Sequence, residues 1–264
     1  RSIQLFDAHL HLRDDRLWPY HEYFLEAMCV AGVGGGIECA CQPCEWRRQP
    51  RLPKGLSMVT AYGIHPWYVE QATPEVLQQL ETLLQTSSSA CVGEIGLDGI
   101  RSVDAAKQAL QRTVFLKQVQ LAIYYQRPII LHGARAWQAL LDTLLPFAQK
   151  LPAVLFHGVM FAPELLQHPF FKACKSCYFS INLQLLNPRS KTLFRLLSHL
   201  PVERLLIETD APDFLPRDAE PLLPGTTLNH PKHLQTLKER LETLLKTKTL
   251  TLYPDFLASL KAHK

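Results

Sequence analysis

Two histidines near the start of the chain could form half of a metal site. The segment Asp7-Ala8-His9-Leu10-His11 continues an apolar stretch that favours a β-strand. Side chains at positions i and i+2 of a strand share a face, so His9 and His11 should point the same way, with Asp7 behind them. Two converging imidazoles are typical of metal ligation. Taken alone, this pattern is explained equally well by a polar loop with incidental histidines.

Four further polar residues lie in or just after apolar segments that predict strands. They are Glu94 within Val92–Asp98, His132 after Pro128–Leu131, His157 after Ala153–Phe156, and Asp210 after Leu205–Glu208. A glutamate in an apolar segment is costly to bury without a partner, and a salt bridge to a core arginine is one alternative. A lone histidine after a strand more often caps or packs. Four histidines and two carboxylates at the C-terminal ends of parallel strands favour a shared site, because barrel enzymes place their active sites there.

The number of candidate ligands favours two metal ions. Six ligands exceed the three or four that one catalytic zinc uses. A bridging carboxylate can hold two ions roughly 3.5–4 Å apart, and Glu94 is central in strand order. Such a centre activates water for attack on a phosphodiester, ester or amide. The donor types accept several divalent ions, so the expected cofactors are two ions of Zn²⁺, Mn²⁺, Mg²⁺, Ni²⁺ or Fe²⁺.

The elements that must position these residues alternate between strands and helices. The predicted strands are Leu5–Ala8, Gly35–Ala40, Met58–Gly63, Cys91–Ile95, Pro128–Leu131, Ala153–Phe156, Tyr178–Ile181 and Leu205–Glu208. Helical spacing of apolar residues appears in Val76–Leu84, Ala105–Tyr125, Ala136–Ala148, Ser190–Leu200 and Lys232–Lys246. This alternation predicts parallel strands with crossover helices. Eight units favour a closed barrel over a doubly wound sheet, and no glycine-rich nucleotide fingerprint follows the first strand.

Two segments near the C-terminus lack this alternation. Pro212–Pro231 is rich in proline, carries Thr226, Thr227 and Asn229, and predicts one long loop over the barrel mouth. Leu250–Leu260 predicts a short terminal helix or turn.

Length and composition fit one soluble α/β domain over residues 1–264. A single barrel needs roughly 250 residues, and the 47% apolar content can supply a large core. The net charge of +4 is too small to indicate nucleic-acid binding by itself. Seven cysteines form no regular disulfide framework, and the N-terminal segment lacks a signal-peptide layout. No apolar run is long enough to span a membrane. We therefore expect a cytoplasmic protein with reduced thiols.

The chain resembles the TatD family of metal-dependent hydrolases, often described as deoxyribonucleases. The motifs that carry the resemblance are FDAHLHL, YGIHPW at Tyr62–Trp67, VGEIGLD at Val92–Asp98, the segment Gln111–His132, FHG at Phe156–Gly158 and PVERLLIETDAPDFLP at Pro201–Pro216. They follow the family's order over most of the chain. The resemblance implies a TIM-type, amidohydrolase-like (β/α)8 barrel that acts on DNA or short oligonucleotides.

The resemblance also implies roles for individual residues. His9 and His11 would bind one ion, and His132 and His157 the second. Glu94 would bridge both ions. Asp210 would join the first ion and orient or deprotonate the attacking water. His65 would contact a substrate phosphate.

The chain departs from the family pattern where substrate contacts are expected. The family's arginine after the fifth-strand histidine is displaced by one position in His132-Gly133-Ala134-Arg135, which leaves Arg135 as a candidate contact or as a residue that points away. The small polar residues that usually follow the sixth-strand histidine are replaced by Val159-Met160-Phe161.

Several other residues have two interpretations. Cys39, Cys41 and Cys44 form C-x-C-x-x-C, for which buried strand thiols fit better than a structural metal site. Trp67 and Tyr68 could line the mouth or pack in the core. Asp98 could orient a ligand or cap a turn, and Glu208 could face the barrel interior or serve a structural role. A basic loop that predicts either a solvated surface or a phosphate contact contains Trp46, Arg47, Arg48 and Arg51.

Three functional hypotheses follow from these observations. The first is a two-metal phosphodiesterase that acts on DNA ends or short oligonucleotides. The second keeps the hydrolytic centre but takes a small ester, lactone or amide, as the apolar segment after His157 would allow. The third is a metal-retaining protein that binds without catalysis. The sequence does not indicate the oligomeric state.

Overall fold

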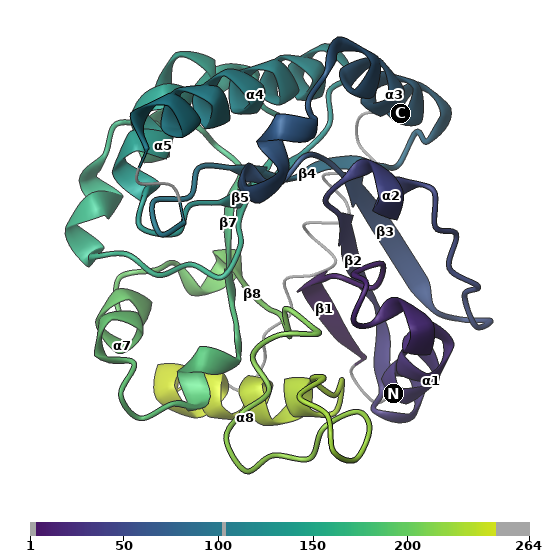
Figure 1. The fold of residues 1–264 in the computed structure, drawn as a ribbon. Coiled ribbons are helices and arrows are strands. Elements are labelled where there is room, and N and C mark those ends of the chain that lie inside the picture. The colour runs from purple at the N-terminus through teal and green to yellow at the C-terminus, as the bar shows by residue number, and fades with distance from the viewer. Residues whose placement is uncertain (1–3, 102–103, 247–264) are drawn as a thin grey trace.

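Eight parallel strands form one sheet that curves into a barrel (Figure 1). The computed structural model describes residues 4–101 and 104–246. The strands are β1 (Leu5–Leu10), β2 (Val33–Ala40), β3 (Ser57–Tyr62), β4 (Cys91–Gly96), β5 (Ile129–His132), β6 (Val154–Phe156), β7 (Cys177–Ile181) and β8 (Leu205–Ile207). Each strand pairs in parallel with the next one along the chain. The predicted (β/α)8 barrel is confirmed.

Backbone hydrogen bonds bring the two edges of the sheet together. The amide of Asp210 donates to the carbonyl of His9 at 2.9 Å, and the amide of His11 donates to the carbonyl of Ala211 at 2.7 Å. These bonds join the end of β1 to the segment after β8. The two stretches that carry His9, His11 and Asp210 are therefore held side by side.

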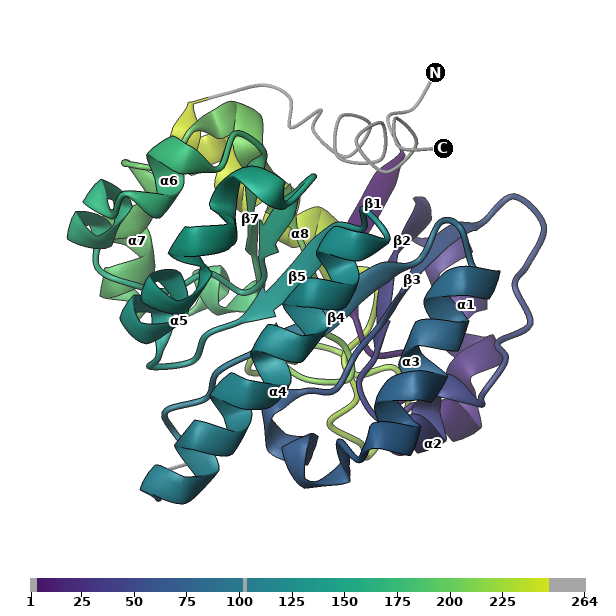
Figure 2. The ribbon, with the colours of Figure 1, turned by 90° about the horizontal axis from the view of Figure 1, so that it is seen from above.

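Helices lie outside the strands (Figure 2). They are α1 (His21–Val30), α2 (Pro43–Trp46), α3 (Pro74–Thr86), α4 (Ala105–Tyr124), α5 (Trp137–Leu144), α6 (Phe170–Ala173), α7 (Lys191–Leu197) and α8 (His233–Leu245). Short 3-10 turns occupy Trp18–Tyr20, Pro66–Gln71, Leu145–Lys150, Pro163–Gln167, Leu183–Leu186 and Val202–Arg204. No helix among the described residues is long and apolar enough to cross a membrane.

The helices begin and end where local chemistry requires it. Thr73 caps α3 by accepting a hydrogen bond from the amide of Val76, and Asp104 caps α4 through the amide of Ala106. The predicted helix over Ala136–Ala148 is wrong at its C-terminal end: α5 ends at Leu144 and a 3-10 turn follows. The cause is Pro146, which has no amide hydrogen and would clash with the preceding turn of a continued helix.

The remaining expectations about elements are met to different degrees. Helix α1 does not stand out in the sequence, because exposed Tyr23 and Val30 blur the apolar pattern of its buried face. The predicted loop over 212–231 is confirmed, since no helix or strand interrupts the chain between β8 and α8. The predicted terminal helix or turn over 250–260 lies outside the described residues. The assignment of residues 1–264 to one domain stays a prediction.

A buried ion pair fixes the start of the barrel. Arg13 donates to Glu38 on β2 at 2.8 Å, and both residues are nearly inaccessible. The same guanidinium donates to the carbonyls of Glu45 and Trp46. The chain after β1 is thereby held against β2 and α2, and the buried charges satisfy each other.

Candidate metal centre and active site

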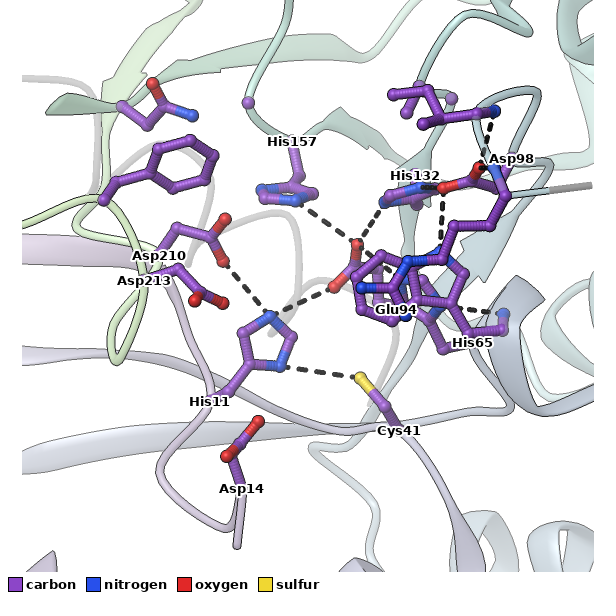
Figure 3. Close-up of a pocket in the computed structure, with 18 of the residues that line it drawn as sticks. His11, Asp14, Cys41, His65, Glu94, Asp98, His132, His157, Asp210 and Asp213 are labelled. Carbon is purple, nitrogen blue, oxygen red and sulfur yellow. Dashed lines mark hydrogen bonds and ion pairs between the residues drawn. The ribbon is translucent and has the colours of Figure 1, made fainter. Parts of the chain in front are cut away.

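The six residues that the sequence analysis selects as metal ligands meet at one end of the barrel, and Figure 3 labels all of them except His9. His9 lies in β1, Glu94 in β4 and His132 at the end of β5. His11 follows β1 directly, His157 follows β6 directly, and Asp210 lies three residues beyond β8. All positions are at the C-terminal ends of strands. All of them except His9 line a cavity of about 680 Å³, which is a normal size for a ligand site.

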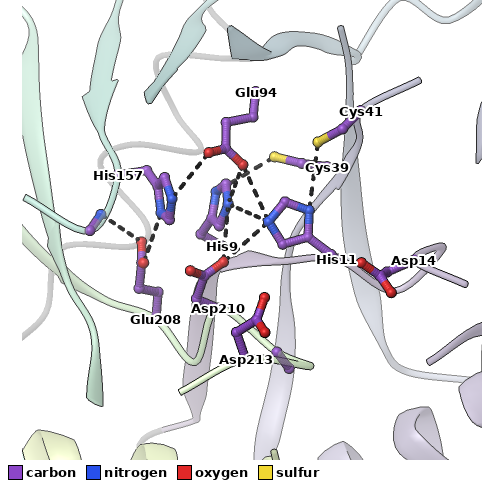
Figure 4. Close-up of polar contacts among 12 residues, drawn as sticks. His9, His11, Asp14, Cys39, Cys41, Glu94, His157, Glu208, Asp210 and Asp213 are labelled. Carbon is purple, nitrogen blue, oxygen red and sulfur yellow. Dashed lines mark hydrogen bonds and ion pairs between the residues drawn. The ribbon is translucent and has the colours of Figure 1, made fainter. Parts of the chain in front are cut away.

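A first group of four ligand atoms has the spacing that one ion requires (Figure 4). Nε2 of His9 lies 3.1 Å from Nε2 of His11 and 3.0 Å from Oε2 of Glu94. Oδ1 of Asp210 lies 3.1 Å from Nε2 of His11 and 3.6 Å from Nε2 of His9. Ligands at the usual distances around a tetrahedral ion are separated by roughly 3.3–3.5 Å. These residues therefore fit a divalent metal.

An unsatisfied oxygen supports the same interpretation. Oδ1 of Asp210 is buried, and although Nε2 of His11 lies 3.1 Å away, the oxygen has no hydrogen bond of good geometry from the described residues. A buried polar atom without a partner is rare and needs a physical reason. An ion held between Asp210 and the two histidines would supply one.

A second group of ligand atoms faces the other oxygen of Glu94. Oε1 of Glu94 lies 2.8 Å from Nδ1 of His132 and 3.3 Å from Nε2 of His157. Nε2 of His65 is 3.4 Å from the same oxygen. The two oxygens of Glu94 thus face different histidine groups, which is the arrangement of a carboxylate that can bridge two ions.

The alternative role considered for Glu94, a salt bridge to a core arginine, is not what the structure shows. The buried Arg13 binds Glu38 instead. Burial alone would raise the pKa of Glu94, but His157, His65 and His9 hold it well below its usual range. The carboxylate is therefore charged. A divalent cation in the centre would balance this negative charge.

Acidic residues orient the histidines of the second group. Nε2 of His132 lies 2.8 Å from Oδ2 of Asp98, and Nδ1 of His157 lies 2.8 Å from Oε1 of Glu208. Glu208 is held in turn by the hydroxyl of Ser180. Histidine ligands commonly use the nitrogen that does not bind metal in this way. Asp98 and Glu208 thus have the contacts of orienting residues.

His65 has a different hydrogen-bonding pattern. Its Nδ1 accepts the amide of Trp67 at 3.0 Å, so in the neutral ring the proton is on Nε2, which points at Glu94. Burial lowers the pKa of His65 to about 4, and the ring is neutral at pH 7. His65 is therefore a donor directed into the cavity.

The structure shows which of the residues with two interpretations lie at the cavity. Trp67, Tyr68 and Arg135 line the cavity. Of the apolar segment after His157, only Met160 reaches the cavity, since Val159 and Phe161 are buried in the core. None of the four residues of the basic loop lines the cavity: Trp46 is buried, Arg48 is paired with Asp15, and Arg47 and Arg51 are exposed.

Asn182 and Cys41 are among the cavity residues that the sequence analysis does not select as site residues. Asn182 follows β7 directly and lines the cavity, so the rule that selects His157 would have selected it as well. Cys41 lines the cavity beside His11. The contact of Cys41 with His11 depends on the register between β1 and β2, which the sequence does not reveal.

Fold and site together define the class of protein. Eight parallel strands with histidines and carboxylates at their C-terminal ends make an amidohydrolase-like barrel of the metal-dependent hydrolase type. The profile of the family described as TatD related DNase matches residues 6–254. The chain belongs to this family, and the predicted resemblance is confirmed.

Individual relatives agree with this assignment. A protein of Yersinia pseudotuberculosis named 3'-5' ssDNA/RNA exonuclease TatD is 34% identical over 172 residues, which is 64% of this chain and 63% of that protein. A protein of the same name from Enterobacter lignolyticus is 31% identical over 239 residues and 90% of both chains. The solved structure of YJJV, a TatD homolog from Escherichia coli, has a TM-score of 0.76 at 24% identity over 98% of this chain and 95% of that one.

Proposed function

We propose that this chain is a metal-dependent phosphodiesterase that hydrolyses single-stranded nucleic acid with two divalent ions. The observation that carries the proposal is the position of the Glu94 carboxylate, whose two oxygens face separate histidine groups. The names of the relatives point to single-stranded DNA or RNA as substrate. Because the alignment covers less than two thirds of the Yersinia protein, its activity is carried over here only as part of this proposal.

In this proposal each ligand has a defined place. His9, His11 and Asp210 hold the first ion, His132 and His157 hold the second, and Glu94 joins both. Bound ions would supply an activated water at neutral pH and would stabilise the charge on the phosphate. Asp210 lines the cavity, and the carboxylate oxygen that does not face the first ion would accept the proton of the attacking water. The ion could be Zn²⁺, Mn²⁺, Mg²⁺, Ni²⁺ or Fe²⁺.

Two residues are proposed as substrate contacts. The Nε2–H of His65 points into the cavity and can donate to a phosphate oxygen. Arg135 lines the cavity with a left-handed backbone (φ 51°) and forms no salt bridge within the described part of the chain. Arg16, by contrast, is already paired with Asp14 and Asp213. Arg135 is thus available to a phosphate group.

Cleavage of labelled oligonucleotide tests the proposal. Purified protein loaded with Mg²⁺, Mn²⁺ or Zn²⁺ should shorten single-stranded DNA, and the variant with both His132→Ala and His157→Ala should not. His199→Ala is a matched control, because His199 is exposed and contacts Ser198 and Arg195 far from the cavity residues. If the wild-type protein cleaves no faster than the double variant with every metal, the phosphodiesterase assignment is wrong.

A specific observation favours a second candidate. Ile100, Met160 and Phe214 are exposed apolar residues that line the cavity, and they would suit a small ester, lactone or amide. In that case a panel of such compounds would be hydrolysed in a Glu94-dependent way while DNA would not.

A location in the cytoplasm also belongs to the proposal. All seven cysteines lie within the described residues and are unpaired, which suits a reducing compartment.

A further inference from the structure

Two cysteines, Cys39 in β2 and Cys41 directly after it, lie beside His9 in β1 and His11 directly after it. Sγ of Cys39 lies 3.6 Å from Nδ1 of His9, and Sγ of Cys41 lies 3.6 Å from Nδ1 of His11 (Figure 4). β1 and β2 are neighbouring parallel strands whose pairing is irregular between Asp7 and Leu10. The side-chain contacts match each histidine of the H-x-H motif with one cysteine of the C-x-C motif.

The two nitrogens of each ring face different partners. Nε2 of both histidines points to Glu94 and Asp210, where the proposed first ion would lie. A neutral imidazole that offers Nε2 to a metal must carry its proton on Nδ1. Apart from the sulfur atoms, no hydrogen-bond partner of either Nδ1 occurs in residues 4–101 or 104–246. Sulfur is thus the acceptor that is available to each Nδ1–H.

The second pair of histidines is supported differently. His132 and His157 each have a carboxylate on the nitrogen that faces away from the proposed second ion. A carboxylate raises the basicity of a ligand histidine, whereas a thiol sulfur is a weak acceptor. The two halves of the centre therefore differ in the strength of their support.

We propose that Cys39 and Cys41 are positioning residues, which fix the rings and tautomers of His9 and His11 so that each presents Nε2 to the first ion. This inference rests on the proposed metal centre. Both thiols are buried, so water does not replace them as acceptors. Nothing in the proposed reaction requires the sulfur atoms to touch substrate.

Metal affinity, measured without substrate, tests this inference. Zn²⁺ is titrated against a competing chromophoric chelator for the wild type and for single Ala and Ser variants of Cys39 and Cys41. We expect each Ala variant to lose about tenfold in affinity for one of the two ions. Each Ser variant should stay close to the wild type, because a hydroxyl can also accept the Nδ1–H. The affinity for the other ion should not change.

Cys91→Ala is the matched control. Cys91 is a fully buried cysteine on β4, and its sulfur contacts no histidine in the described residues. Its truncation leaves a similar cavity in the barrel without removing an acceptor. If the Ala variants of Cys39 and Cys41 bind both ions as tightly as Cys91→Ala does, the inference is overturned.

A spectroscopic measurement separates positioning from direct coordination. Cys41, His11 and Glu94 each have a ligand atom within 4.8 Å of the others, so direct binding of sulfur to the ion is the competing arrangement. We expect Co²⁺-loaded protein to lack a sulfur-to-cobalt charge-transfer band in the near ultraviolet. A band that disappears in Cys41→Ser would show direct ligation and would overturn the positioning role.

The measurements distinguish a failure of this inference from a failure of the proposed function. A protein that binds two ions with the expected Cys dependence but leaves DNA intact would refute the nuclease and retain the positioning pair. Cleavage of DNA together with unchanged affinities in the Ala variants would do the reverse. A wild-type protein that takes up no metal would overturn both.

Discussion

His132 shows how a single side chain is held in place at this site. Both of its ring nitrogens lie 2.8 Å from carboxylate oxygens, Nδ1 from Glu94 and Nε2 from Asp98. Asp98 is fixed by further donors, among them the indole of Trp67 at 2.9 Å and the amide of Ile100 at 2.8 Å. Burial acts to raise the pKa of Asp98, but the hydrogen bond from His132 and the other donors hold it well below its usual value. Asp98 is thus a charged residue that orients the ring.

Asp98→Asn is expected to weaken metal binding at the His132 side of the centre. The amide keeps the shape of the carboxylate but loses the charge that holds the Nε2–H of His132. Loss of such an outer partner typically costs 10–100-fold in metal affinity, and competition titration with Zn²⁺ measures it. Asp142→Asn is the matched control, because Asp142 also pairs with a histidine at 2.8 Å but lies at the surface beside His168. Equal affinity in the two variants would contradict the orienting role.

At the scale of elements, close approach of β4 and β5 brings Glu94 and His132 into contact. Gly96, at the end of β4, permits this approach. A Cβ atom added to it would lie 1.9 Å from the carbonyl oxygen of His132, and its φ of 150° lies where side chains are rarely accommodated. The ladder between these strands is also irregular between Gly93 and Ile95, as is common where a side chain is redirected toward a site. The strand ends are thus shaped around the cluster.

Gly96→Ala should therefore damage both stability and the site. Backbone strain and overpacking each cost roughly 1–3 kcal/mol, so urea unfolding should show a loss of at least about 2 kcal/mol. Metal affinity should fall as well, because His132 must move. Gly225→Ala separates the two contributions, since Gly225 has φ 77° but no atom within 4 Å of the added Cβ. That control should lose only the unfolding free energy that the backbone strain costs, and its metal affinity should be normal. Equal effects at both positions would show that the contact with His132 is unimportant.

The elements themselves could be predicted because their signals are local. Short apolar segments, separated by stretches in which apolar residues recur at helical spacing, predict all eight strands in order. Each predicted strand overlaps the observed one. The failures have identifiable physical causes. Pro146 interrupts a helix that the apolar spacing alone would continue. Trp46 lies in a segment whose basic composition is typical of a surface loop, but its indole donates to the carbonyls of Ala40 and Gly63 and is buried.

The site is predictable to the extent that strand ends determine it. In a parallel barrel all C-terminal ends meet, so His132, His157 and Asp210 can be brought together without coordinates. Contacts that depend on register or on side-chain direction cannot. To predict the pairing of Cys41 with His11, one must know how β1 and β2 are aligned. To predict that the two oxygens of Glu94 face different histidine groups, one must know the positions of the rings.

At the scale of the whole molecule, the centre connects distant parts of the chain. The six clustered residues come from β1, β4, β5, β6 and the segment after β8. Glu94 and Asp210 are buried charges that the folded chain brings near each other. An unfolded chain cannot hold these residues at ion-binding distances. Any ion bound at this centre therefore binds the native state in preference to the unfolded state, and its binding free energy adds to stability.

Metal removal should accordingly lower the thermal midpoint of the intact protein. At a free metal concentration 100 times Kd, one site contributes about 2.7 kcal/mol, which corresponds to roughly 5–10 °C for a protein of this size. Scanning calorimetry with Zn²⁺ and with EDTA measures the difference. His157→Ala should lose much of the metal-dependent shift, whereas His199→Ala should keep it, because His199 is exposed outside the cluster. A midpoint that is equal with Zn²⁺ and EDTA would mean that the clustered residues do not bind an ion.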